Sequence, residues 1–332
     1  MNSIYLDNAA TTPVLQEVFD SMQEYFVLQY ANPSSAYDFA QKARNAIDLA
    51  RKQAADLIGA EKDEIYFTSG GSEADNWAIK GAADFFRGKR NKIVTTPIEH
   101  HAVLNTVEFL KKYGFDVEYI PVDKSGIVDL EKAEKIIGDN TAIVSVMLAN
   151  NETGALQPVK EIAAMAHNKD AYFHTDAVQA AGHIKIDVKN IQCDMLSVSG
   201  HKFGAPKGIG FLYKKNGIEI SSFIHGGSQE KGLRAGTENV PYIVALGKAC
   251  SLAAINLEEE YTKTKNLRDF FEDMVLNSVQ DCVLNGSKEN RLPGTSNISF
   301  LGLSGKSIVS ALSSKDVYKR QILLSVINIK SL

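Results

Sequence analysis

The middle of the chain alternates between two hydrophobic periods. Short apolar runs of the kind that form buried strands occupy residues 64–68, 92–95, 116–120, 142–148, 171–176, 195–198 and 209–213. Stretches with helical spacing separate the first five of them, at 72–86, 101–113, 130–137 and 159–168. Strands separated by helices form βαβ units, so the pattern predicts an α/β fold with a mainly parallel sheet and helices on both faces.

The segments on either side of this alternation predict three parts of the chain. Residues 1–12 are polar around a short β-prone tip, which is typical of an arm lying on the main body. Helical spacing from 14 to 26 and from 37 to 58 then opens a large domain over 13–254, which a long helix starting near Pro241 closes. Residues 255–332 predict a smaller α/β unit, with helices near 267–279 and 304–312 and a strand near 296–301.

Composition narrows the function classes. The 332 residues are 44% hydrophobic and 23% charged, with a formal charge of −4, which is ordinary for a soluble protein and gives no basic footprint for nucleic acid or an anionic membrane. We find neither a signal segment nor an apolar run of spanning length, so a cytoplasmic location is expected. The cysteines, Cys193, Cys250 and Cys282, are too widely spaced for a zinc site or a disulfide framework, and no metal is expected.

One lysine occupies an unusual position. Lys202 lies in a glycine-rich turn between two strand-like runs, bracketed by Ser199 and His201. Such an amine could hold a carbonyl cofactor as a Schiff base, with a phosphate bound by the adjacent Ser and His, or it could be an ordinary charge at a hairpin tip. The turn alone does not decide between these interpretations.

A carboxylate upstream favours the interpretation of Lys202 as a cofactor-binding lysine. Asp176 ends the strand-like run 171–176, where a buried acid is costly unless it meets a cation or a strong donor. The protonated ring nitrogen of pyridoxal phosphate is such a cation. Asp176 could instead cap a following helix, but a strand ending in Asp and a later strand ending in Ser-x-His-Lys rarely occur together by accident.

The motif string around these residues resembles a known family. HTDAVQAAG and SVSGHKFGAPKGIGFLY, together with IYLDNAATTPV, FTSGGSEADN, PIEHHAVLN, LANNETGALQPV and HGGSQEKGLRAGTENV, are similar to the NifS-like cysteine desulfurases, over about residues 1–314. The resemblance implies a type I fold of the pyridoxal phosphate (PLP)-dependent transferases, with a seven-stranded sheet and a homodimer that shares its active site. It also implies conversion of L-cysteine to L-alanine and transfer of persulfide sulfur to an acceptor or scaffold protein, for iron–sulfur clusters or thio-cofactors.

The resemblance also assigns roles to residues of this chain. Lys202 would be the Schiff-base lysine that moves the substrate's α-proton, and His100 would stack on the cofactor ring and assist proton transfer. Asp176 would face the ring nitrogen, and Gln179 the phenolic oxygen. The remaining cofactor contacts would be Gly71, Ser72, Ser199 and His201 at the phosphate, Asn151 beside the phenolic oxygen and the substrate, and Thr237 at the partner subunit's phosphate.

Some of these residues also have plainer interpretations. Ser72 and Asp75 could form a helix-capping pair, which would be compatible with phosphate binding. His100 and His201 could be polar loop residues, and 225–239 could be a mobile surface loop.

The end of the chain departs from the family pattern. Relatives follow the helix near 304–312 with a strand and then a Ser/Gly-rich loop that holds the nucleophilic cysteine, and none of the three cysteines here matches it. We therefore expect residues from about 316 to be foreign sequence, the small domain to be incomplete, and the chain to bind PLP without forming the persulfide.

Three other functions remain to be compared with this one. The first is a selenocysteine lyase or another class V PLP enzyme, and the second is a non-catalytic PLP-binding partner protein. The third, a nicotinamide-dependent enzyme, is disfavoured, because neither 204–210 nor the segment ending at 304–307 fits a nucleotide-binding glycine fingerprint.

Overall fold

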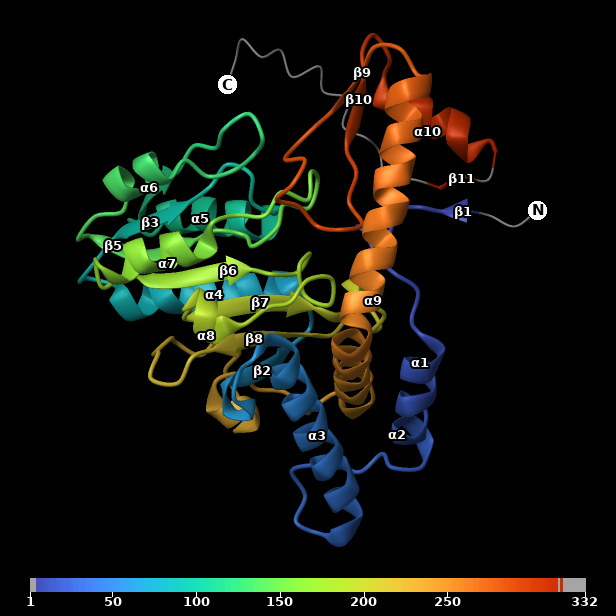
Figure 1. The fold of residues 1–332 in the computed structure, drawn as a ribbon. Coiled ribbons are helices and arrows are strands. Elements are labelled where there is room, and N and C mark those ends of the chain that lie inside the picture. The colour runs from blue at the N-terminus through green and yellow to red at the C-terminus, as the bar shows by residue number, and fades with distance from the viewer. Residues whose placement is uncertain (1–3, 316, 319–332) are drawn as a thin grey trace.

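The computed structural model describes residues 4–315 and 317–318 (Figure 1). Within them the main sheet has seven strands, in the order β2-β8-β7-β6-β5-β3-β4. The strands are β2 (Ile65–Thr68), β3 (Lys92–Thr95), β4 (Asp116–Tyr119), β5 (Thr141–Ser145), β6 (Tyr172–Asp176), β7 (Met195–Ser199) and β8 (Gly210–Lys214). Only β8 is antiparallel to its neighbours, β2 and β7, so the predicted mainly parallel sheet is confirmed.

The sheet separates two apolar clusters, one on each face. Side chains alternate across a strand, so Ile143 of β5 joins one cluster and Val144 the other. The first face is covered by α4 (Gly71–Phe86) and α5 (His101–Lys111). The second is covered by α3 (Gln41–Ile58), α6 (Leu130–Ile136), α7 (Val159–His167), α8 (Val188–Ile191) and α9 (Val240–Ser278). The prediction of helices on both faces is therefore confirmed.

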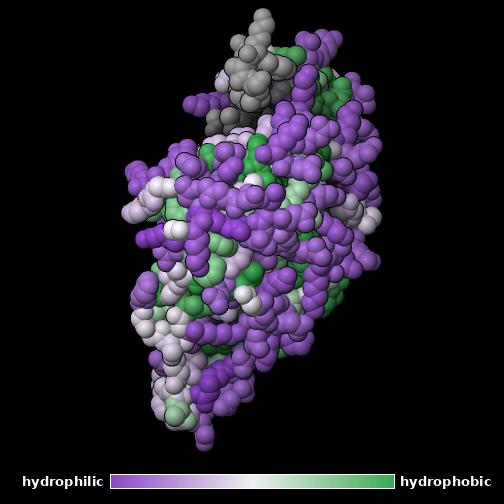
Figure 2. Space-filling view, turned by 90° about the vertical axis from the view of Figure 1, so that its left-hand side faces the viewer, coloured by the Kyte–Doolittle hydropathy of each residue, from purple (hydrophilic) through white to green (hydrophobic). Residues whose placement is uncertain are grey.

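The outer sides of α5, α6 and α7 are mostly polar (Figure 2). Figure 2 views the molecule from the side where α5, α6 and α7 lie in Figure 1, and that surface is mostly hydrophilic with scattered apolar residues. The apolar stripes of the helices thus face the sheet, as helical periodicity predicts.

A single helix connects the two predicted domains. We expected a long helix from Pro241 and a second one near 267–279, but α9 is continuous over 39 residues. Between them lies a run of good helix formers with neither glycine nor proline, so nothing interrupts the backbone hydrogen bonds. The domain boundary predicted near residue 254 falls inside this helix and stays a prediction.

The apolar half of α9 is a core element. By length and composition α9 could cross a membrane. However, Ile243, Leu246, Ala249 and Cys250 are buried, and this half packs against α3 and α1 (Gln16–Met22). Core packing therefore accounts for its composition.

The smaller unit contains the elements that the sequence predicts, and one more. The predicted strand and helix appear as β10 (Ile298–Phe300) and α10 (Gly305–Ser313), and β10 pairs with an unpredicted antiparallel strand, β9 (Cys282–Leu284). The arm strand β1 (Ile4–Tyr5) pairs in parallel with β11 (Val317–Tyr318). Apart from these last two residues, the segment predicted to be foreign, from about 316, lies outside the described residues.

The remaining elements are short. They are α2 (Glu24–Val27) and the 3-10 turns η1 (Asp38–Ala40), η2 (Lys62–Glu64), η3 (Gly200–Lys202) and η4 (Gln229–Gly232).

Candidate active site

The candidate site lies at the carboxyl ends of β6 and β7. Asp176 is the last residue of β6 and Ser199 the last of β7, and the strands are parallel neighbours, so both residues reach the same edge of the sheet. The chain then turns through η3, which carries Lys202. A side chain at Gly200 would lie 2.8 Å from both Ala205 Cβ and Leu246 Cδ1, so this tight turn requires glycine.

Lys202 is held by the backbone of the N-terminal arm. Its Nζ donates hydrogen bonds to the carbonyl oxygens of Ala9, at 2.6 Å, and Ala10, at 3.0 Å. Gln179 Nε2 also donates to Ala9 O, at 3.1 Å. Lys202 and Gln179, predicted from two separate motifs, therefore meet at one carbonyl group of a third motif, the arm segment IYLDNAATTPV.

Asp176 belongs to the same site. It is 5% exposed, and burial raises its pKa to about 6, although the backbone N–H of Val178 and the nearby Lys202 charge both act in the opposite direction. Its Oδ1 accepts from Val178 N at 2.8 Å, which is a local turn contact rather than the cap of a regular helix. The structure thus places Lys202 and Asp176 within electrostatic reach of each other.

A small-residue cradle opens beside them at the start of α4. A Cβ at Gly70 would lie 3.5 Å from Ser199 Oγ, and one at Gly71 would lie 2.6 Å from Val178 Cγ2. Gly70 has φ +149°, in the region that favours glycine. A helix of 16 residues that begins here presents free N–H groups to an anion, with Ser72 exposed at its first turn.

The alternative role for Ser72 and Asp75 is wrong. The N-cap residue of α4 is Gly70, which has no side chain with which to cap the helix. Asp75 lies on the inner side of the helix and is 1% exposed. A capping partner would have to point back to the helix start, and Asp75 points into the core instead.

His201 connects the turn to the N-terminal arm through hydrogen bonds. Its Nδ1 lies 3.1 Å from Thr11 Oγ1, and its carbonyl oxygen accepts from both the amide and the hydroxyl of Thr12. Burial, and then the neighbouring charges of Lys202 and Lys207, lower the pKa of the imidazole to about 4. His201 is therefore neutral at physiological pH, and it can contribute a hydrogen bond but no positive charge.

His100 closes the site from the start of α5. It is exposed at the N-cap position, where its Nδ1 accepts from Ala102 N at 3.1 Å, which leaves Nε2 as the protonated nitrogen. Side-chain donor atoms of Asp75, His100 and Asp176 all lie within 4.8 Å of one another. Two carboxyl groups and an imidazole at this spacing provide a site for a cationic group.

Two buried acids in this region were missed by sequence reasoning. Burial raises the pKa of Glu99 to about 8, and burial followed by the charge of Asp176 raises the pKa of Asp75 well above its usual value. A signal existed for Asp75, because it interrupts an otherwise apolar stripe of α4 formed by Ala74, Ala78 and Ala82. No comparable pattern marks Glu99.

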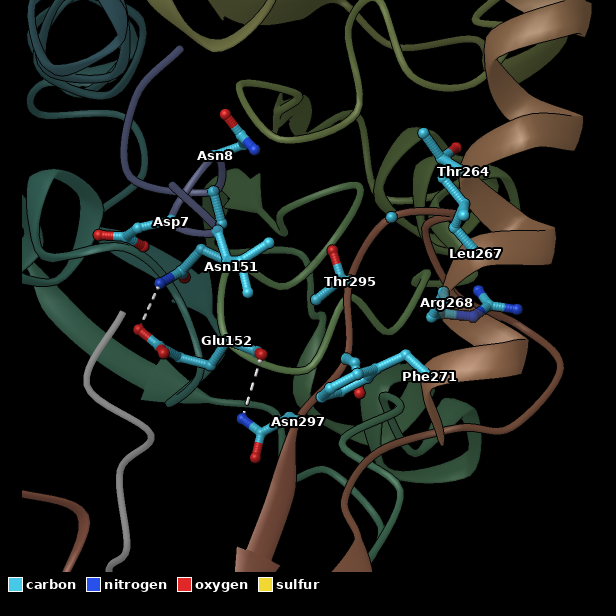
Figure 3. A pocket seen from close by; sticks show the side chains of 14 residues that line it. Asp7, Asn8, Asn151, Glu152, Thr264, Leu267, Arg268, Phe271, Thr295 and Asn297 are labelled. Atoms are coloured by element: carbon cyan, nitrogen blue, oxygen red, sulfur yellow. Dashed lines mark hydrogen bonds between the residues drawn. The ribbon is translucent and has the colours of Figure 1, made fainter. Parts of the chain in front are cut away.

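A cavity of about 350 Å³ lies on the other side of the arm (Figure 3). Its wall includes arm residues 6–9, Asn151 and Glu152, and side chains of α9 and the smaller unit such as Phe271. Asn151 Nδ2 donates to Glu152 Oε1 at 2.8 Å. Ala9 and Asn151 both line this cavity, and the Ala9 carbonyl oxygen also accepts from Lys202.

Thr237 is exposed in the loop 225–239, outside this cluster. Two of its ion pairs hold the loop to the main body. Arg234 Nε pairs with Glu73 Oε1, on the first turn of α4, at 2.8 Å, and Glu230 pairs with Arg51 at 2.7 Å. These ion pairs fix the loop beside the glycine cradle.

The comparisons with known proteins identify the family. The aminotransferase class-V family model matches residues 4–321, and the chain belongs to that family. Cysteine desulfurase IscS of Clostridium botulinum (strain Hall) is 49% identical over 317 residues, covering 95% of this chain and 80% of the relative. The IscS of Methanosarcina thermophila is 49% identical over 316 residues, with 95% and 78% covered.

Solved structures give the same result. A NifS-like protein superposes with a TM-score of 0.93 at 38% identity, covering 96% of this chain and 87% of its own. A structure of SspA in complex with cysteine has a TM-score of 0.83 at 39% identity, covering 94% and 87%. The predicted type I fold is therefore confirmed, and within the family the relatives of this chain are the IscS and NifS cysteine desulfurases.

Proposed function

We propose that the chain binds pyridoxal 5′-phosphate at Lys202 and takes L-cysteine as its substrate, as cysteine desulfurases do. The observation that carries this proposal is the meeting of Lys202 with Asp176 and Gln179, from two separate motifs, beside a glycine cradle. The names of the relatives, and the cysteine bound to SspA, support the choice of substrate. A selenocysteine lyase would use the same residues, and a substrate screen separates the two.

The residues present fit this cofactor. Bound pyridoxal phosphate supplies an electron sink for breaking bonds at the substrate's α-carbon. The open cradle at Gly70 and Gly71, with the N–H groups of α4, suits a phosphate. Asp176 is buried where a positive ring nitrogen would offset the cost of its charge.

Each side chain then has a task. Lys202 supplies the amine for the cofactor's aldehyde and, once released, moves the proton at the substrate's α-carbon. His100 would lie over the bound cofactor and could exchange protons through Nε2. The supporting contacts would be Gly71, Ser72, Ser199 and His201 at the phosphate, Gln179 at the phenolic oxygen, and Asn151 beside the substrate.

The lysine assignment can be tested by absorbance. The purified 332-residue chain mixed with pyridoxal phosphate should show the band of lysine-bound cofactor, and Lys202→Ala should remove it. Lys207→Ala, in the same turn but exposed, is the matched control and should keep the band. If borohydride reduction and peptide mapping located the cofactor on another lysine, the proposal would fail.

None of the three cysteines is placed to be the sulfur nucleophile. Cys193 precedes β7 at its amino end, six residues from Ser199, and is therefore roughly 15–20 Å from the site edge. Burial raises the pKa of the thiols of Cys193 and Cys250, so neither forms the reactive thiolate. Cys282 lies in the hairpin of the smaller unit, with Sγ 3.1 Å from Val279 O.

This placement leads to a second candidate function, a non-catalytic PLP-binding partner protein. We expect the 332-residue chain to bind cofactor and L-cysteine but to release no sulfide when a reductant is added. Sulfide release at rates typical of enzymes would contradict this, and single Cys→Ser variants would then identify the thiol. Capture of a sulfur acceptor or scaffold protein without turnover would favour the partner role.

We further propose a homodimer with a shared site. Several apolar side chains of the N-terminal helices and the following turn are at least 46% exposed, which is more than an isolated chain usually leaves uncovered. They are Phe19, Phe26, Val27, Leu28, Tyr30, Tyr37 and Phe39. Thr237 would then contact the phosphate bound by the partner subunit, and cytoplasm remains the expected location.

The shared site predicts a complementation pattern. A Lys202→Ala dimer should bind no cofactor covalently, and a Thr237→Ala dimer should bind it weakly. A mixed dimer of the two variants should contain one intact site and bind cofactor there with normal affinity. Weak binding by the mixed dimer would place Thr237 in its own chain's site, and normal binding by the Thr237→Ala dimer would place it outside the site altogether.

A further inference from the structure

Asp75 occupies a position that neither folding nor the proposed cofactor contacts explain. It lies one helical turn after Gly71, on the inner side of α4, and is 1% exposed. Within the described part of the chain, its Oδ1 is a buried oxygen without a hydrogen-bond partner. A carboxyl group in such a place is costly unless a nearby group uses it.

The buried groups facing Asp75 provide no counter-charge, whereas the His100 imidazole within 4.8 Å of it is exposed to solvent. His174 of β6 lies 3.6 Å away, but its two ring nitrogens contact the hydroxyls of Ser145 and Ser197 at 2.9 Å each, and burial lowers its pKa to about 3. Glu99, before α5, and Asp176 are themselves acids and disfavour a second charge.

The two neighbouring carboxyl groups differ in their surroundings. Asp176 accepts a backbone N–H from Val178 and faces the Lys202 ammonium, and both contacts favour its ionised form. For Asp75, among the described residues, a hydrogen bond from the Ser197 hydroxyl favours the ionised form. Complete burial and the charges of Asp176 and Glu99 favour the neutral form, and their combined effect is larger. When the surroundings of two nearby carboxyl groups push their pKa values apart in this way, the group with the higher pKa keeps its proton.

We propose that Asp75 is a positioning residue that remains a neutral carboxylic acid in the assembled site and donates its proton as a hydrogen bond to the Asp176 carboxylate. This inference rests on the proposed cofactor. A carboxyl oxygen of Asp75 and one of Asp176 lie within 4.8 Å of each other. Asp176 Oδ1 already accepts the Val178 N–H, so Asp176 Oδ2 is the oxygen that would accept from Asp75. The pair then carries one negative charge, which matches the single positive charge of a protonated ring nitrogen.

Three variants separate the possible roles of Asp75. Asp75→Asn is neutral and keeps an N–H donor at the same place, whereas Asp75→Leu is neutral and keeps only the volume. Asp84→Asn changes an exposed carboxylate on the same helix and is the control. Circular dichroism and melting show which variants fold, and a failure of the leucine variant to fold leaves the asparagine variant to decide.

The first readout needs no cofactor. Infrared difference spectra of the full chain, wild type against Asp75→Asn, should show the carbonyl stretch of a protonated carboxylic acid that is present at neutral pH and absent from the variant. The control Asp84→Asn should leave this band in place. If the band of Asp75 is that of a carboxylate at neutral pH, the proposal is wrong, whether or not the chain binds pyridoxal phosphate.

The second readout uses the loaded protein. Asp75→Asn should bind the cofactor within about threefold of wild type, and the pH at which the cofactor band titrates should be unchanged. Asp75→Leu should bind at least about tenfold more weakly, as expected for the loss of a hydrogen bond to a charged group. A leucine variant that binds like wild type, or an asparagine variant whose titration moves by about one pH unit, would overturn the proposal. Loss of binding by wild type itself would instead refute the proposed function.

Discussion

Glu99→Gln offers a quantitative test of the buried acids beneath the site. Glu99 is 4% exposed, and its Oε1 accepts from Thr96 Oγ1 at 2.7 Å and from Met147 N at 3.0 Å. Its Oε2 has no hydrogen-bond partner within the described residues. A glutamine keeps the accepting oxygen and places its NH₂ where the protonated acid carries its hydroxyl, so the substitution imitates the neutral form.

The expected effect follows from the pKa of Glu99. Burial raises it from 4.5 to about 8 in the folded chain, against the opposing hydrogen bonds from Thr96 and Met147. Unfolding between these two pH values therefore releases a proton. The stability that this group contributes is fully present below about pH 4.5 and is lost as pH rises to about 8. At 1.36 kcal/mol per pKa unit, the shift from 4.5 to about 8 makes the whole loss about 5 kcal/mol.

Urea unfolding of the chain without added cofactor measures this difference. At pH 5 the free energies of unfolding of wild type and Glu99→Gln should agree closely. At pH 8 the variant should be the more stable protein by several kcal/mol, since only the wild type then has to hold a neutral acid against its tendency to ionise. Glu134→Gln, at an exposed position of α6, should follow wild type throughout. A constant difference between wild type and Glu99→Gln from pH 5 to 8 would refute the reasoning.

Two further substitutions test the cradle and the smaller unit. Gly71→Ala would bring a Cβ to 2.6 Å from Val178, so we expect pyridoxal phosphate affinity to fall at least about tenfold, as a fluorescence titration would show. Gly138→Ala, with open space around it among the described residues, should bind normally. Arg291→Met would leave Glu272 buried without its ion-pair partner, at a cost of about 3–5 kcal/mol. Melting curves should show this loss, and the double variant with Glu272→Leu should recover much of it; a double variant as unstable as the single one would contradict the ion-pair argument.

The main sheet could be predicted because its signals are local. Each central strand is a short apolar run, and the alternation of Ile143 and Val144 between the two faces follows from side-chain geometry alone. The strand β9 was missed because CVL is too short to stand out, and it is fixed by pairing with β10 fourteen or more residues further along. The continuous α9 was missed because the predicted domain boundary near residue 254 suggested a break in the helix, which the backbone does not need.

The site residues that belong to recognisable motifs could be predicted, whereas those whose role depends on burial were missed. Lys202 and Asp176 stand out in the sequence as unusual residue types after strands, Gln179 was assigned through the family resemblance, and the fold brings the three together. Asp75 and Glu99 look like ordinary helix and loop acids until the tertiary structure removes them from water. Their importance is a property of the assembled core, which no local pattern records.

The contact between the arm and Lys202 runs through main-chain oxygens, of Ala9 and Ala10. Exchanging side chains along the arm should therefore matter little to the amine, whereas a change in the backbone path should matter a great deal. A one-residue insertion after Ala10 would shift Thr11 and Thr12 out of register with His201 while leaving every original side chain present. In this region the length of the chain is under tighter constraint than its composition.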